Sequence, residues 1–246
     1  MSSLIANGLA HHVQELGTGS AVPVVMTHGL VIGSLASWFF TAGPLLAQTR
    51  RVRMYDLRGH GRTARAPSGY DTRTLAGDLD ELTRDLPVFD LVGHSWGALV
   101  ALRFARLHPD RVRRLVLVEA PLPPASAIEM TEFLAAGPEA LLDALPESLR
   151  TAVASGRRQA QRLVDSVVHL VRDTTLLADI RAEPAPATTT LAGVLCVYGD
   201  VSACRAGGEQ FARAIGARFE ILPGGHYLHL DARAELAAMI KDHLDG

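Results

Sequence analysis

Lysine is almost absent from this sequence of 246 residues, because Lys241 is the only one and arginine supplies the remainder of the 24 basic side chains. The 26 acidic residues leave a formal charge of −2. A chain without excess positive charge has no basic face on which to bind a polyanion, so nucleic acid is not expected as a partner. We interpret the preference for arginine, with abundant alanine, as the codon bias of a GC-rich bacterial genome.

Cysteine and long apolar runs are scarce as well. Cys196 in an expected strand and Cys204 in the loop after it form neither a disulfide framework nor a CxxC metal motif. No stretch approaches the roughly 20 uninterrupted apolar residues of a membrane span. Residues 1–8 show no basic segment followed by an apolar run, as an export signal would. We therefore expect a cytoplasmic protein without a membrane span or a metal site.

Short runs that are apolar on both faces alternate with amphipathic helical patterns along most of the chain. Strands are expected at 22–27, 51–55, 89–92, 112–118, 195–198 and 219–222, and helices at 72–86, 97–107 and 232–244. Strands that are buried on both faces are typical of parallel sheets covered by helices. The pattern predicts an α/β fold, with a mostly parallel sheet flanked by helices.

Residues 122–190 interrupt this alternation. The segment begins in a proline-rich stretch that includes Pro123 and Pro124, contains no strand-like run, and ends after Pro184-Ala185-Pro186. Helical spacing within it predicts a small helical insertion, which we interpret as a lid that limits access to a site. The predicted division is a core of residues 1–121 and 191–246 with a lid of residues 122–190.

A sharp turn, Gly93-His94-Ser95-Trp96-Gly97, joins an expected strand to an expected helix. Ligands of parallel α/β sheets bind at the carboxyl ends of the strands, where this turn lies. A G-x-S-x-G turn presents its serine as a nucleophile, and glycine is needed on both sides because a side chain there would collide with neighbouring elements. The free N–H groups of the following helix favour an oxyanion. Ser95 is therefore the candidate nucleophile.

With three further landmarks, this turn makes the chain resemble the lidded α/β-hydrolase superfamily. The landmarks are His28-Gly29, Asp56-Leu57-Arg58-Gly59-His60-Gly61 and Gly224-Gly225-His226, and they occur in the order typical of the superfamily. The resemblance covers nearly everything outside the insertion. It implies an α/β-hydrolase sheet, a catalytic triad and an oxyanion hole, and it implies that no cofactor is required.

Ten histidines compete to be the base that activates the serine hydroxyl. His226 is favoured because it follows a late strand, in agreement with the superfamily order of nucleophile, acid and histidine. The landmark histidines are expected to shape loops through hydrogen bonds, and His11 is expected at the surface. By resemblance, the oxyanion hole consists of the backbone N–H groups of Leu30 and Trp96.

The acid of the triad is missing from its usual place. The superfamily commonly has aspartate three residues beyond the glycine that ends the seventh strand, but Ser202 occupies that position and Asp200 lies two residues early. Some haloalkane dehalogenases place a glutamate at the end of the sixth strand instead, and Glu119 matches that position. A carboxylate that closes an apolar strand needs a partner such as histidine. We favour Glu119 over Asp200, and Ser95 in place of their aspartate nucleophile argues against halide displacement and epoxide opening.

These residues predict a hydrolase of carboxylic esters or thioesters that forms an acyl-enzyme on Ser95. Its partner would be a small-molecule acyl substrate, free or linked to a carrier. One alternative is a biosynthetic cyclase or acyltransferase that passes the acyl group to an alcohol or amine. Carbon–carbon hydrolysis and cofactor-free haloperoxidase-like activity also occur on the scaffold. A third hypothesis is a non-catalytic small-molecule binding protein, for which Ser202 is the only supporting feature.

Overall fold

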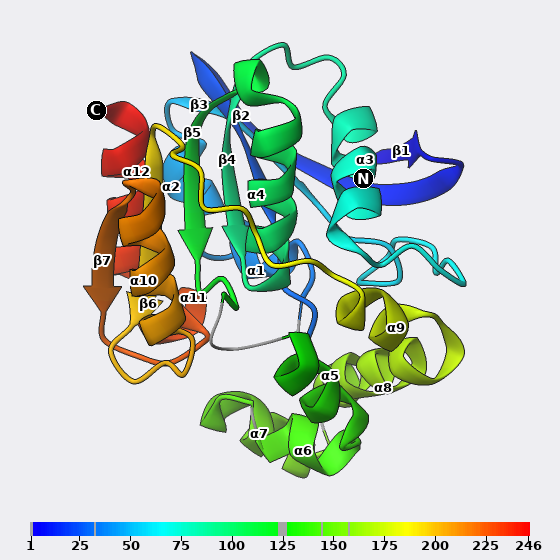
Figure 1. Cartoon of the computed structure of the whole chain (residues 1–246). Helices are drawn as coiled ribbons and strands as arrows, with labels where there is room; N and C mark the ends of the chain where they lie inside the picture. Colours follow the sequence, from blue (N-terminus) through cyan, green and yellow to red (C-terminus); the bar gives the residue numbers. More distant parts are fainter. Residues whose placement is uncertain (1, 32, 123–126, 144, 157) are drawn as a thin grey trace.

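The computed structural model describes residues 2–31, 33–122, 127–143, 145–156 and 158–246. Within these residues seven strands form one sheet, shown in Figure 1. The strands are β1 (Ser2–Ala6), β2 (Leu9–Thr27), β3 (Arg50–Tyr55), β4 (Phe89–His94), β5 (Val112–Val118), β6 (Val194–Gly199) and β7 (Arg218–Leu222). Every expected strand is present, and β1 and the first half of β2 are additions to the prediction.

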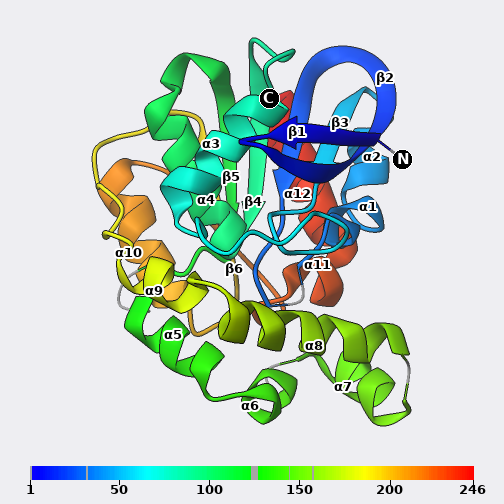
Figure 2. The same cartoon turned by 90° about the vertical axis from the view of Figure 1, so that its right-hand side faces the viewer.

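The long β2 bends back on itself, so that β3 lies between its two halves (Figure 2). Val52 pairs with Leu16 in the first half of β2, which runs antiparallel to β3, and with Val24 in the second half. From that second half onward, β4, β5, β6 and β7 follow in parallel register. The predicted α/β fold with a mostly parallel sheet is confirmed.

Helices cover both faces of this sheet, as the view along its edge shows (Figure 2). Side chains of a strand alternate between the faces, so Leu91 joins one apolar cluster and Val92 the other. The first cluster packs under α3 (Thr72–Leu82), α4 (Trp96–Leu107) and α10 (Arg205–Ile215), and the second under α1 (Ala36–Phe39), α2 (Gly43–Leu46), α11 (Leu228–Asp231) and α12 (Arg233–Asp245). The core is therefore double, with the sheet between its halves.

In the described part of residues 122–190, five helices lie beyond the carboxyl ends of the parallel strands (Figure 1). They are α5 (Ala127–Ala135), α6 (Pro138–Asp143), α7 (Glu147–Ala154), α8 (Arg158–Asp173) and α9 (Leu176–Arg181). Asp179 of α9 accepts hydrogen bonds from the backbone N–H groups of Gly69 and Tyr70, at 3.1 and 2.8 Å, which fastens the group to the loop before α3. Pro123 and Pro124 lie outside the described residues. No helix in the described ranges is long and apolar enough to cross a bilayer.

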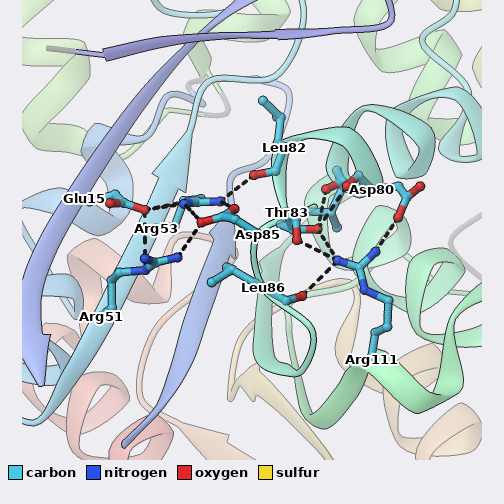
Figure 3. A network of polar contacts seen from close by, with 10 residues as sticks. Glu15, Arg51, Arg53, Asp80, Leu82, Thr83, Asp85, Leu86 and Arg111 are labelled. Carbon is cyan, nitrogen blue, oxygen red and sulfur yellow. Dashed lines mark hydrogen bonds and ion pairs between the residues drawn. The ribbon is translucent and has the colours of Figure 1, made fainter. Parts of the chain in front are cut away.

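Arginine side chains fasten α3 and the loop after it to the sheet (Figure 3). Arg53 of β3 makes a paired contact with Asp85, at 2.6 and 2.9 Å, and also donates to Glu15 and to the carbonyl of Leu82. Arg111 donates to the carbonyl of Leu86 at 3.1 Å. These guanidinium groups satisfy backbone carbonyls at the end of α3 and in the loop after it. The network lies ahead of β4, at the opposite end of that strand from Ser95.

Candidate active site

Ser95 occupies a strained turn between β4 and α4. Its backbone has φ 54° and ψ −125°, a combination that non-glycine residues rarely adopt, and its N–H donates to the carbonyl of Val118 at 2.9 Å. A Cβ on Gly93 would lie 2.5 Å from the carbonyl oxygen of Gly97, and a Cβ on Gly97 would lie 2.3 Å from that of His28. Both glycines are therefore required by close backbone approach, for the steric reason that the motif suggested.

The structure brings Ser95, His226 and Glu119 together. The Oγ of Ser95 lies 2.9 Å from Nε2 of His226, and Nδ1 of His226 lies 3.1 Å from Oε2 of Glu119. A carboxylate oxygen only accepts, so the proton of a neutral imidazole resides on Nδ1 and leaves a lone pair on Nε2. That lone pair faces the Ser95 hydroxyl. Three residues that lie far apart in the sequence thus form one continuous series of hydrogen bonds.

Glu119 is fully buried directly after β5, and it also has a positive φ of 54°. Its own N–H donates to the carbonyl of Val197 at 2.9 Å, which holds the residue against β6. Its carboxylate accepts from the N–H of Gly199 at Oε1 and from the hydroxyl of Ser202 at Oε2, both at 2.5 Å. A buried carboxylate requires such donors, and together with His226 these satisfy it.

Asp200 lies elsewhere. Its side chain is exposed, and its Oδ1 accepts the N–H of Gly224 at 2.9 Å. The carboxylate of Asp200 therefore stabilises the loop after β7. The carboxylate that accepts the hydrogen bond of His226 is that of Glu119. Of the two acids that the sequence offered, the geometry supports Glu119.

Two backbone N–H groups beside Ser95 were expected to form an oxyanion hole. Trp96 is the first residue of α4, and the first N–H groups of a helix have no acceptor within that helix. Leu30 follows Gly29, at which a Cβ would lie 2.9 Å from Cβ of Ser95. His60 Nε2 donates to the carbonyl of Leu30 at 3.0 Å and so fixes this turn. Leu30 and Trp96 line the same cavity as Ser95.

Burial keeps the histidines around the hydrogen-bonded series of Ser95, His226 and Glu119 neutral. Burial, with a smaller electrostatic effect of the neighbouring His60, lowers the pKa of His28 to about 4, and burial, with His226, does the same for His229. Burial also lowers the pKa of His94, whose Nε2 donates to the carbonyl of His226 at 2.8 Å. His28 and His94 therefore shape loops through their hydrogen bonds, as their place in the landmarks suggested.

His226 itself is shifted in the other direction. Burial alone would lower its pKa, but the contacts with Cys204 and Glu119 outweigh burial and raise the pKa of His226 above its usual value near 6.5. The expectation that His11 lies at the surface is wrong, because His11 is fully buried and its Nδ1 contacts the carbonyl of Asp56 at 3.2 Å. The polar alternation at the start of β2 hid its position.

A cavity of about 310 Å³ opens beside Ser95 and His226. Its far wall is formed by Met130, Phe133 and Leu134 of α5. Helix α5 thus completes a largely apolar chamber whose other wall carries Ser95 and His226. Apolar chambers with a few convergent polar groups are typical of small-molecule sites.

The sequence did not predict that two further residues contact the side chains of the site. Ser202 appeared only as a missing acid, yet its hydroxyl binds the acid that is present. Cys204 appeared as a loop cysteine, yet its Sγ lies 3.8 Å from Nδ1 of His226. The spacing of Ser202 from Gly199 was the one available signal, because it marks the usual position of the acid. No motif pointed to Cys204.

Comparison with known proteins concerns the fold. A sequence model of the family described as "alpha/beta hydrolase fold" matches residues 22–164. The 2-hydroxy-6-oxo-2,4-heptadienoate hydrolase of Pseudomonas putida is 41% identical over 125 residues, which are 48% of this chain and 43% of that protein. The dihydrolipoyllysine-residue acetyltransferase component of the acetoin cleaving system of Pseudomonas putida is 40% identical over 113 residues, 42% of this chain and 28% of that protein.

These two matches span 43% and 28% of the curated relatives. Among solved structures, the enol-lactonase from Burkholderia xenovorans LB400 aligns over 100% of both chains with a TM-score of 0.78 and 22% identity. At that level of identity, the likeness concerns the fold.

Proposed function

This chain belongs to the α/β-hydrolase fold family, and from that premise we propose that it is a serine hydrolase that cleaves carboxylic esters or thioesters. The observation that carries the proposal is the hydrogen-bonded chain from Ser95 through His226 to Glu119, with distances of 2.9 and 3.1 Å. A nucleophile in contact with a base, and a base oriented by an acid, is the arrangement that acyl transfer requires.

In the acylation step, the Oγ of Ser95 attacks the acyl carbon while Nε2 of His226 takes its proton. The imidazolium that forms is stabilised by the buried carboxylate of Glu119. The carbonyl oxygen becomes an oxyanion, which the N–H groups of Leu30 and Trp96 bind. His226 then gives its proton to the leaving alcohol or thiol, and the acyl group stays on Ser95.

Deacylation repeats these steps with water. His226 takes a proton from the attacking water, the tetrahedral intermediate again places its oxyanion between the two N–H groups, and the proton returns to Ser95 as the acid leaves. These steps move only protons and one acyl group, so the described side chains supply all of the acid–base chemistry.

The acyl group would occupy the cavity of about 310 Å³ against α5. Its wall on α5 is apolar at Met130, Phe133 and Leu134, with Glu129 beside them, and this apolar part favours an apolar acyl chain of a small molecule or of a carrier-linked thioester. We assign residues 122–190 the role of a lid over this chamber, with the core in residues 1–121 and 191–246. The binding-protein hypothesis loses its support, because Ser202 acts as a donor to Glu119.

Labelling with a fluorophosphonate probe tests the nucleophile. We expect one covalent adduct per chain by intact mass, none in Ser95→Ala, and full labelling in Ser155→Ala, which removes an exposed serine at the end of α7. No adduct on the native chain, or an adduct that persists in Ser95→Ala, would overturn the assignment of Ser95. Hydrolysis of a panel of p-nitrophenyl esters and acyl thioesters tests the substrate class, and failure on both panels by a chain that is labelled would refute that class.

A further inference from the structure

A thiol lies on the side of His226 that faces away from Ser95. The Sγ of Cys204 is 3.8 Å from Nδ1 of His226, and that nitrogen is 3.1 Å from Oε2 of Glu119. These atoms all lie within 4.8 Å of one another. One sulfur, one imidazole nitrogen and one carboxylate oxygen therefore converge on a single small space.

This set has the composition and spacing of a zinc site. Zinc bonds of roughly 2.3 Å to sulfur and 2.0–2.2 Å to nitrogen and oxygen, at tetrahedral angles, place sulfur about 3.6 Å from nitrogen and nitrogen about 3.4 Å from oxygen. The corresponding separations here are 3.8 and 3.1 Å. Two of the three separations thus differ from these values by a few tenths of an ångström, and the third, between the sulfur and the carboxylate oxygen, is below 4.8 Å. Calcium and magnesium, by contrast, prefer oxygen ligands.

Ser202 holds two of these ligands in place. Its hydroxyl donates to Oε2 of Glu119 at 2.5 Å, and its Oγ accepts the N–H of Cys204 at 3.1 Å. Such outer contacts orient the ligands of metal sites. Cys204 and His226 also line the cavity of about 310 Å³, which offers a path for the cation and room for a fourth ligand from solvent.

We propose that Glu119, Cys204 and His226 form an inhibitory binding site for a thiophilic divalent cation of the zinc class. On binding, the Cys204 thiol loses its proton to solvent, and bonds form from the cation to Sγ, Nδ1 and Oε2. The proton on Nδ1 must leave that atom, which breaks the hydrogen bond to Glu119, and a neutral imidazole then carries its proton on Nε2.

That tautomer explains the inhibition. With the proton on Nε2, His226 donates toward Ser95 and has no lone pair with which to accept the serine proton. The Leu30 and Trp96 N–H groups and the apolar wall on α5 are untouched. We therefore expect the cation to lower kcat with little change in KM. The inhibition rests on the proposed serine mechanism, whereas binding of the cation requires only the three ligands.

Binding is tested first, without turnover, on the reduced chain free of any histidine tag. Titration with Co²⁺ should produce a near-ultraviolet thiolate-to-metal charge-transfer band, and equilibrium dialysis should find one Zn²⁺ per chain. Ser95→Ala should give the same band, so this result does not depend on catalysis. Cys204→Ala should lose the band, and Cys196→Ala should keep it, because burial raises the pKa of the Cys196 thiol to about 12 within β6. No band in the native chain, or a band that persists in Cys204→Ala, would refute the site.

Inhibition is tested by Zn²⁺ titration of ester hydrolysis and of the fluorophosphonate labelling rate, each variant being compared with its own metal-free rate. The Zn²⁺ concentration for half-inhibition should rise at least about tenfold in Cys204→Ala and stay near the native value in Cys196→Ala. Equal sensitivity of Cys204→Ala and the native chain would overturn the proposal. A bound cation that leaves the labelling rate unchanged would refute the inhibitory role.

Discussion

Replacing Glu119 by glutamine should nearly abolish turnover while leaving the fold intact. Glutamine keeps the volume of the side chain, and its carbonyl oxygen can still accept the N–H of Gly199, as Oε1 of Glu119 does at 2.5 Å. Its amide nitrogen would then face Nδ1 of His226 in place of Oε2. Because this amide nitrogen can only donate, it forms a hydrogen bond with His226 only if Nδ1 is an acceptor without a proton.

The imidazole would therefore adopt the wrong tautomer, with its proton on Nε2 and pointing at Ser95. It also loses the charge that stabilises the imidazolium. The corresponding change in serine proteases lowers kcat by roughly 10⁴-fold, and we expect a loss of kcat/KM of about 10³–10⁴-fold here. At about 1.36 kcal/mol per tenfold, this corresponds to roughly 4–5.5 kcal/mol of transition-state stabilisation.

The assay is kcat/KM on a p-nitrophenyl ester together with the second-order rate of fluorophosphonate labelling, with circular dichroism and thermal unfolding as checks of the fold. Asp200→Asn is the matched control, because it removes an exposed carboxylate that binds Gly224, and its kcat/KM should change by less than about threefold. Near-native activity of Glu119→Gln, together with a large loss in Asp200→Asn, would refute our assignment of the acid.

A second variant sharpens this test. The hydroxyl of Ser202 lies 2.5 Å from Oε2 of Glu119, so a carboxylate introduced at residue 202 would reach the same space. In the native background, Ser202→Asp should be harmful, because two carboxylates would share one site. In the Glu119→Gln background it should restore kcat/KM at least about tenfold. No recovery in the double variant would mean that residue 202 is not placed to orient His226.

Three further predictions concern the base, the cavity and the turn. Because only neutral His226 can accept a proton and its pKa is raised, kcat/KM should fall as the pH drops through a value above 6.5. This acid limb of the pH profile should move to lower pH in Cys204→Ala, and an unmoved limb would contradict the effect of Cys204 on the pKa of His226. Phe133→Trp should shrink the acyl cavity and lower kcat/KM by about fourfold for each methylene that no longer fits, with acetyl esters unaffected. Gly97→Ala would place a Cβ 2.3 Å from a carbonyl oxygen and should cost about 1–3 kcal/mol in urea unfolding, whereas Gly77→Ala, with its nearest neighbour at 3.5 Å, should stabilise α3 by about 0.5–1 kcal/mol.

The central strands could be predicted from the sequence because each contains a short run of apolar residues, such as Leu91 and Val92 in β4 and residues 115–118 in β5. The first half of β2 was missed since one of its faces meets solvent, which gives a polar pattern without a long apolar run. Helix α10 was missed because Gly207 and Gly208 weaken its helical pattern. A Cβ on Gly208 would lie 2.1 Å from the ring of Tyr198, so packing against the sheet requires the glycine that hides the helix.

For the site, Ser95 follows from its local motif, and His226 from its motif together with the superfamily order. Glu119 follows from the resemblance to dehalogenases with a glutamate after the sixth strand, together with the cost of ending an apolar strand with a charge. The contacts of Ser202 and Cys204 could not be predicted in the same way. They join residues 83 and 22 positions apart, and they depend on how the loop after β6 folds over the end of β5. Sequence patterns report local geometry, whereas these contacts are set by the register of neighbouring strands.

The hydrogen bonds that hold Ser95 and Glu119 have a consequence for how the protein can change. Ser95 is anchored to the carbonyl of Val118, and Glu119 to that of Val197, so each residue takes its position from the next strand. The acyl chamber, by contrast, takes its far wall from α5, which belongs to neither strand. Substitutions on α5 can therefore shift the range of substrates by small steps while the reaction stays the same. Over evolutionary time, we expect the helices to diversify and the edge of the sheet to be retained.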